Sequence, residues 1–186
     1  MKIENATKYE NGNITALLDT EGLVGVNNVT IVRAEDGSIK AYPPTRPYTA
    51  KNGTKGYEKI VFFKNFEEAD AEAARMVEEQ DDKFYPFREP MQIKGGQKLG
   101  LATLQAHIAL KVSVLPATAD KAARLIIPTR EYNKKLEDGK TERKTGYYVW
   151  PFTQQGDELK TEIAALTEQI IAEAKPYEPK KNVEGE

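Results

Sequence analysis

The sequence contains one motif twice, Pro-Thr-Arg-x-Tyr, at residues 44–48 and again at residues 128–132, 84 residues later. In both copies an alternating apolar strand, a polar turn and a second strand lead into the motif. In both, a polar loop and an aromatic strand opened by Gly-Tyr follow it, at Gly56 and Gly146. The elements of the two copies match in order as well as in sequence. We therefore predict that the chain is a tandem duplication and that the resemblance between its halves is not due to chance.

A helix is expected after each aromatic strand. Asn65, with Glu68 three residues later, resembles a capping box at the start of the first helix. Apolar residues with helical spacing then define one face of each helix. They are Phe66, Ala69, Ala73, Met76 and Val77 in the first helix and Leu159, Ile163, Leu166 and Ile170 in the second. Each unit is therefore predicted to be a small antiparallel sheet with a C-terminal helix, an α+β fold.

The repeat divides the chain into two units, residues 1–82 and residues 91–174. Residues 83–90 are expected to form a linker. They contain Pro86 and Pro90, and proline breaks a continuing helix. Residues 175–186 are polar and contain two more prolines, so a flexible tail is expected there.

The first copy resembles the SpoVG (stage V sporulation protein G) family of small bacterial proteins. The resemblance rests on residues 28–32 as a strand, Glu35-Asp36-Gly37 as a turn and residues 39–46 as a strand and corner. The second copy matches more loosely, through residues 127–130. Membership would imply a septation or gene-expression regulator that binds DNA or RNA as a homodimer. In a duplicated chain the dimer contact becomes intramolecular, so we expect two SpoVG-like units packed as a pseudo-dimer within a monomer.

The net charge of −2 is the sum of two unlike segments. Residues 66–82 hold eight acidic residues and one arginine, whereas residues 88–144 hold twelve basic residues and six acidic ones. The basic segment favours a DNA or RNA partner. The acidic helix supports an alternative function, a protein-interaction module of a phage or mobile element.

The candidate nucleic-acid-binding residues lie at the two corners and in the second polar loop. Arg46 and Arg130 occupy equivalent corners, where a guanidinium could grip phosphate, pair with a carboxylate or cover the sheet edge. The loop at 133–145 is six residues longer than its counterpart, through either an added function or a tolerated hairpin extension. Its basic residues are Lys134, Lys135, Lys140, Arg143 and Lys144.

Composition argues against several kinds of chemistry. The chain has no cysteine and one histidine, His107, so a disulfide frame, a thiol nucleophile and a multi-histidine metal site are not expected. Neither of its two serines lies in a Gly-x-Ser-x-Gly motif. An enzyme stays open as a third class, but no carboxylate pair is singled out by spacing. We therefore predict a non-enzymatic protein without metal or cofactor, and, from the lack of any long apolar run, a cytoplasmic one with no membrane partner.

Overall fold

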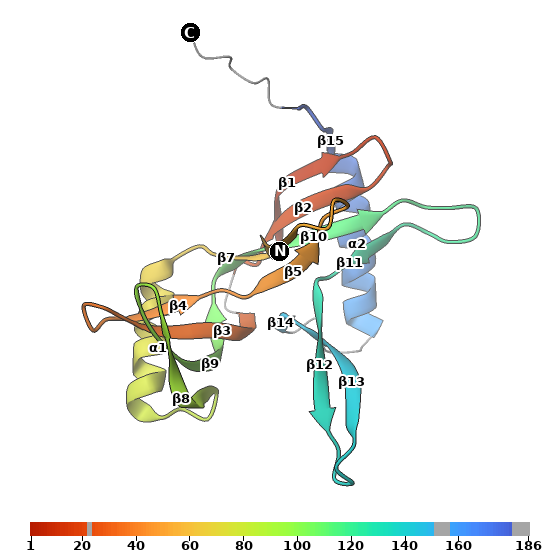
Figure 1. The fold of residues 1–186 in the computed structure, drawn as a ribbon. Coiled ribbons are helices and arrows are strands. Elements are labelled where there is room, and N and C mark those ends of the chain that lie inside the picture. Colours follow the sequence, from red (N-terminus) through yellow and green to blue (C-terminus); the bar gives the residue numbers. More distant parts are fainter. Residues whose placement is uncertain (22–23, 151–156, 180–186) are drawn as a thin grey trace.

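The fold is described from a computed structural model, over residues 1–21, 24–150 and 157–179 (Figure 1). Within these residues the chain forms two main sheets, two separate hairpins and two helices, and most strand pairs are antiparallel. The α+β class with antiparallel sheets is thereby confirmed.

The first sheet comprises six described strands: β1 (Lys2–Lys8), β2 (Ile14–Asp19), β7 (Val61–Phe63), β10 (Ile108–Leu115), β11 (Arg124–Ile126) and β15 (Lys175–Pro176). Their order is β11-β10-β2-β1-β15, and β7 pairs with β10 on the same edge as β11. The β1–β15 pair is parallel, and the others are antiparallel.

The second sheet comprises five described strands: β3 (Val24–Ala34), β4 (Ile39–Tyr42), β8 (Phe84–Ile93), β9 (Gly96–Ala106) and β14 (Val149–Trp150). Their order is β14-β3-β9-β8, and β4 pairs with β3 on the same edge as β14. Two hairpins form separate two-stranded sheets. We call them the first arm, β5 (Thr45–Thr49) with β6 (Lys55–Lys59), and the second arm, β12 (Thr129–Lys135) with β13 (Thr141–Tyr147).

Each main sheet is built from both halves of the chain. In the first sheet β1, β2 and β7 come from the first half, and β2 and β7 pair with β10 of the second half. In the second sheet β8, β9 and β14 come from the second half, and β9 and β14 pair with β3 of the first half. The two sheets therefore exchange equivalent strands, and neither half completes a sheet of its own within the described residues.

Two of the places where the chain passes from one sheet to the other lie side by side. One follows Asp19 at the end of β2, and the other is His107, between β9 and β10. Asp19 Oδ1 lies 2.5 Å from His107 Nε2, and the Thr20 amide donates to the Ile108 carbonyl at 3.0 Å. The pKa of Asp19 is lowered chiefly by the hydrogen bond from the Glu21 amide, with His107 and Lys64 adding to it. His107 is thus a partnered histidine at a sheet junction.

The helices cover different sheets, on opposite sides of the view in Figure 1. Helix α1 (Phe66–Glu79) packs on β4 and β9, and α2 (Asp157–Glu173) packs on β11 and other strands of the first sheet. The Asn65 side chain caps α1 by accepting from the amides of Glu67 and Glu68, as its spacing predicts. One apolar core cluster joins sheets and helices, through residues such as Leu18, Ile31, Met76, Leu104 and Ile170.

Helix α1 departs from the expected apolar face at one residue. Ala69, Ala73 and Met76 are buried as predicted, and Val77 is partly buried. Phe66, at the first turn, is 54% exposed and meets Phe63 edge-on instead of entering the core. In α2, Leu166 and Ile170 are buried, and Ile163 is half-buried. The side chain of Leu159 lies outside the described part.

The segment expected to be a linker, 83–90, lies mostly within strand β8. Proline is tolerated there because β8 is an edge strand, paired with β9 alone. The pairing also shifts register between Pro86 and Met91, so the second proline, Pro90, falls in the irregular stretch. The prolines therefore mark a bulged edge strand and not a boundary between units.

The tail expected at 175–186 begins as ordered structure. Lys175 and Pro176 pair with Thr7 and Lys8 of β1, and the Tyr177 amide donates to the Lys8 carbonyl at 2.8 Å. The Tyr177 ring stacks on Tyr9 with centroids 5.2 Å apart. These contacts fix the start of the tail, and residues 180–186 lie outside the described part.

The strand exchange predicts that the halves need each other to fold. Residues 1–82 and 83–186, produced separately, should each show little cooperative unfolding, because β3 would lose β9 and β10 would lose β2. Mixing them should restore the circular dichroism and the dispersed amide NMR spectrum of the intact chain. Two fragments that each melt cooperatively alone would contradict this.

Candidate nucleic-acid interface

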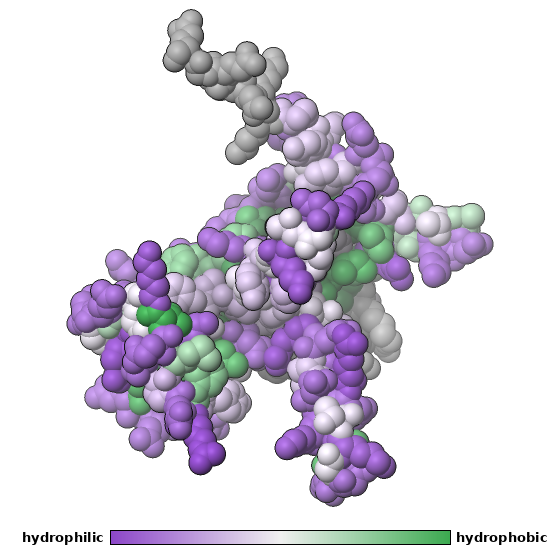
Figure 2. All heavy atoms as spheres, in the orientation of Figure 1, coloured by the Kyte–Doolittle hydropathy of each residue, from purple (hydrophilic) through white to green (hydrophobic). Residues whose placement is uncertain are grey.

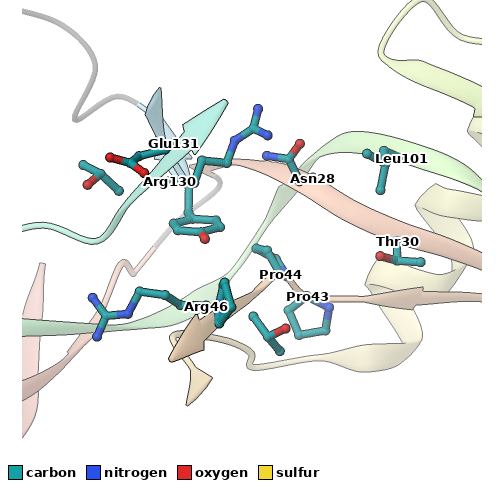
Figure 3. Close-up of a pocket in the computed structure, with 12 residues that line it drawn as sticks. Asn28, Thr30, Pro43, Pro44, Arg46, Leu101, Arg130 and Glu131 are labelled. Atoms are coloured by element: carbon teal, nitrogen blue, oxygen red, sulfur yellow. The ribbon is translucent and has the colours of Figure 1, made fainter. Parts of the chain in front are cut away.

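The two Pro-Thr-Arg corners lead from the sheets into the arms and meet at one cavity. Arg46 begins the first arm beside β4, and Arg130 begins the second arm after β11. Both line a cavity of about 600 Å³, together with Tyr148 and the prolines of the first corner (Figure 3). The repeated motif therefore brings its two arginines to one site.

A tyrosine and a glycine of the repeat meet in each arm. A side chain at Gly56 would place its Cβ 2.9 Å from the ring of Tyr48, and one at Gly146 would approach the Tyr132 ring to 3.1 Å. Glycine is needed because each ring lies directly over its backbone. This contact gives a physical reason for the recurrence of both the last tyrosine of the motif and the glycine of Gly-Tyr.

Arg46 forms an ion pair with a carboxylate of its own arm. It lies directly opposite Glu58 in the first arm, and its Nε and Nη2 donate to Glu58 Oε2 at 3.2 and 2.5 Å. Lys111 of β10 donates to the other oxygen, Oε1, at 2.5 Å. Of the roles considered for Arg46, pairing with a carboxylate is the one observed.

The pKa of Glu58 is governed by these contacts. Burial is the largest single influence and raises the pKa, but the hydrogen bonds and charges of Lys111 and Arg46 together outweigh it. The net result is a pKa below the ordinary value of 4.5. Glu58 is therefore ionised at neutral pH and neutralises both cations in part.

Arg130 has no such partner, because the second arm pairs in a register displaced by two residues. In the first arm Arg46 lies opposite Glu58, whereas in the second arm Arg130 lies opposite Gly146, which has no side chain. Its guanidinium lies 5.1 Å from the centroid of the Tyr132 ring, and its Nε is buried without a hydrogen-bond acceptor. Among the described residues no carboxylate forms an ion pair with it, so its charge is available to a ligand.

The second arm projects from the body of the protein, and its surface is mostly hydrophilic (Figures 1 and 2). Three of its predicted basic residues make exposed ion pairs within the arm: Lys140 with Asp138, Arg143 with Glu131 and Lys144 with Glu142. Such exposed pairs contribute little to stability. Lys134 and Lys135 are exposed and make no ion pair with any described residue.

The first arm is a basic surface that the sequence analysis did not single out. Lys51, Lys55 and Lys59 are exposed on it and form no ion pair in the described chain. Two of its tyrosines are also exposed, Tyr48 by 50% and Tyr57 by 77%. The sequence feature that indicates this surface is the group of lysines around the repeated Gly-Tyr, at residues 51, 55 and 59.

Half of the acidic residues at 66–82 have partners inside the protein. Asp70 pairs with Lys40 at 2.9 Å and accepts from the Ala41 amide at 2.8 Å. Arg75 binds Glu72, Glu79 and Asp81, which raises its pKa further above the ordinary value. Glu67, Glu68, Glu78 and Asp82 make no ion pair with a described residue, and only this smaller group could serve a basic protein partner.

Among the described residues, no three His, Cys, Asp or Glu side chains lie together in a way that could hold a metal ion. No helix in the described part is long and apolar enough to cross a membrane.

Compared with family models, curated proteins and solved structures, the chain matches none of them significantly.

The ion pairs around Glu58 predict a pH-dependent contribution to stability. Glu58→Gln should lower the free energy of unfolding at pH 7 by about 1–2 kcal/mol, because Arg46 and Lys111 lose a charged acceptor. Since the folded pKa is below 4.5, the difference from wild type should be complete above that pH and vanish as the pH falls through the folded pKa.

The control is Glu131→Gln, which removes the same charge from an exposed pair in the other arm. Urea unfolding of this variant should differ from wild type by less than about 0.5 kcal/mol. Equal losses in the two variants would contradict the central role of Glu58.

Proposed function

We propose that this protein is a non-enzymatic, nucleic-acid-binding regulator that holds DNA or RNA with its two basic arms. The observation that carries the proposal is the set of exposed lysines without ion pairs on the arms, Lys51, Lys55 and Lys59 on the first and Lys134 and Lys135 on the second. Lysines in such positions release counterions when they meet phosphate, which is the main source of sequence-independent affinity.

The shape of the arms supports the same function. A two-stranded ribbon is narrow enough to enter the major groove of a duplex or to follow a single strand. The exposed Tyr48 and Tyr57 add aromatic faces on which bases can stack. Basic and aromatic side chains on one hairpin suit nucleic acid better than an acidic protein surface, which would use the charges but not the rings.

We further propose that the chain is a tandem SpoVG-like duplication arranged as a pseudo-dimer. The order of elements supports this: a hairpin, two strands, an arm, a short strand and a helix occur once in each half. The pairing is also reciprocal, since β2 pairs with β10 just as β9 pairs with β3. A dimer of single units with exchanged hairpins, joined into one chain, would give this topology.

Binding to the arms should depend strongly on salt. If about four phosphates are neutralised, the logarithm of the binding constant should fall with the logarithm of salt concentration at a slope of about −3 to −4. Replacing Lys51 and Lys55 with Gln, or Lys134 and Lys135 with Gln, should flatten the slope by about 1–2 in each case. Fluorescence anisotropy with labelled single-stranded and duplex oligonucleotides measures this.

A matched control removes two exposed lysines outside the arms, Lys83 and Lys94, and should leave the slope unchanged. An absence of binding to DNA and RNA at low salt would overturn the proposal. The unpaired acidic residues Glu67, Glu68, Glu78 and Asp82 would then make a protein-interaction module the better interpretation.

The internal pseudo-dimer predicts a monomer in solution. Both edges of β3 and of β10 already pair with strands of the same chain. A second copy therefore finds no free edge on either central strand. Light scattering at micromolar protein should give a mass near 20.8 kDa. A mass twice as large would indicate that strands pair between chains.

A further inference from the structure

The two corners form equivalent hollows with different chemistry. The first hollow, of about 240 Å³, contains Arg46 and Glu58 from one half and Lys111 from the other. The 600 Å³ cavity contains the residues that stand at the same places in the repeat. The equivalences are Arg46 with Arg130, Glu58 with Tyr148 and Lys111 with Asn28.

In the first hollow the carboxylate of Glu58 pairs with Arg46 and Lys111. In the 600 Å³ cavity no carboxylate of a described residue pairs with Arg130. Tyr148 replaces the carboxylate, and two buried donors remain without acceptors in the cavity, Arg130 Nε and Asn28 Nδ2. A buried donor without an acceptor is costly, so the arrangement favours a bound group that carries one. Figure 3 shows Arg130 extending toward Asn28, while Arg46 points away from both.

The surrounding groups favour a negatively charged ligand. Glu131 also lines the cavity, but it pairs with Arg143, and in Figure 3 it lies on the other side of the Arg130 backbone from the guanidinium. Burial raises the pKa of the Tyr148 phenol, although Arg130 and Arg46 act against this, so the phenol is neutral at pH 7 and can donate a hydrogen bond. The unpaired positive charge of Arg130 is thus the main source of the electrostatic field inside the cavity.

A third hollow, of about 500 Å³, adjoins the 600 Å³ cavity and shares Asn28, Leu101 and Arg130 with it. Its walls include the rings of Tyr85, which is 58% exposed, and Tyr132, which is 37% exposed. Aromatic faces beside an arginine are the usual platform for an unpaired base. A phosphate group would use the donors, and a base would use the rings.

We propose that the joined hollows bind one unstacked nucleotide, with its phosphate on Arg130 and Asn28 and its base against Tyr85 and Tyr132. This inference rests on the proposed nucleic-acid function and adds a preference to it. Bases in a duplex are stacked and paired, so a single strand supplies such a nucleotide at far lower cost. The arms then provide affinity for any polyanion, and the hollows favour single strands.

The test uses a ligand too small to depend on the exposed lysines of the arms. The ¹⁵N-labelled full-length protein is titrated with uridine 5′-monophosphate at low salt, and the amide NMR signals of Asn28, Arg130 and Tyr132 are followed. Saturable shifts of these signals are expected. Inorganic phosphate and N-acetylglutamate should each bind at least about 10-fold more weakly, because they lack the base.

Two variants locate the site. Arg130→Gln removes the cation, and Asn28→Asp places a carboxylate where it can pair with Arg130, as Glu58 does with Arg46. The backbone φ of Asn28 is 61°, a conformation that aspartate also tolerates, so the second variant should keep the fold. Both should weaken nucleotide binding by about 10-fold or more. Arg33→Gln, an exposed charge further along β3, is the matched control and should have no effect.

The possible failures are distinguishable. If the nucleotide causes no shifts, or the same shifts in Arg130→Gln, the site assignment is overturned even where oligonucleotides still bind the arms. Equal binding of inorganic phosphate would overturn the base contact, and tighter binding of N-acetylglutamate would show that the ligand is a protein carboxylate. Nucleotide binding without oligonucleotide binding would instead remove the arms from the proposed function.

Discussion

The pairing of β3 with β9 and of β10 with β2 is the constraint on which the rest of the molecule depends. Each of these central strands comes from one half and receives a hairpin from the other. The crossings at Asp19 and His107 must therefore lie together, and they are tied by hydrogen bonds. The same exchange brings the two Pro-Thr-Arg corners to one cavity, so the candidate site exists only when both halves are in place.

The repeat predicted the elements of the fold but not their partners. Alternation of apolar residues identifies a strand and its buried face, yet it is satisfied by any neighbour that covers that face. The exchange between halves was for this reason invisible in the sequence. Pro86 and Pro90 were misread for a related reason, because proline marks either a break or an edge strand, and only the pairing with β9 decides between them.

The two arginines of the candidate site could be predicted from the sequence, but the residues that they contact could not. Equivalent positions in the repeat drew attention to Arg46 and Arg130. What separates them is a two-residue displacement in hairpin register, which puts Glu58 opposite one and Gly146 opposite the other. Such a displacement depends on turn geometry and on the packing of Tyr132 over Gly146, and neither is written in the motif. Lys111 could not be assigned to Arg46 either, since it reaches Glu58 only through the exchange.

The outer edges of the sheets also have a bearing on how this protein behaves when crowded. Strand β15 covers part of the open edge of β1, and the bulged β8 presents prolines at the far edge of the second sheet. The arms keep open edges, but they carry Lys51, Lys55, Lys134 and Lys135, whose like charges oppose the approach of a second ribbon. The lysines that would attract nucleic acid thus also discourage intermolecular β-sheet, and the arms can stay long and exposed without nucleating aggregates.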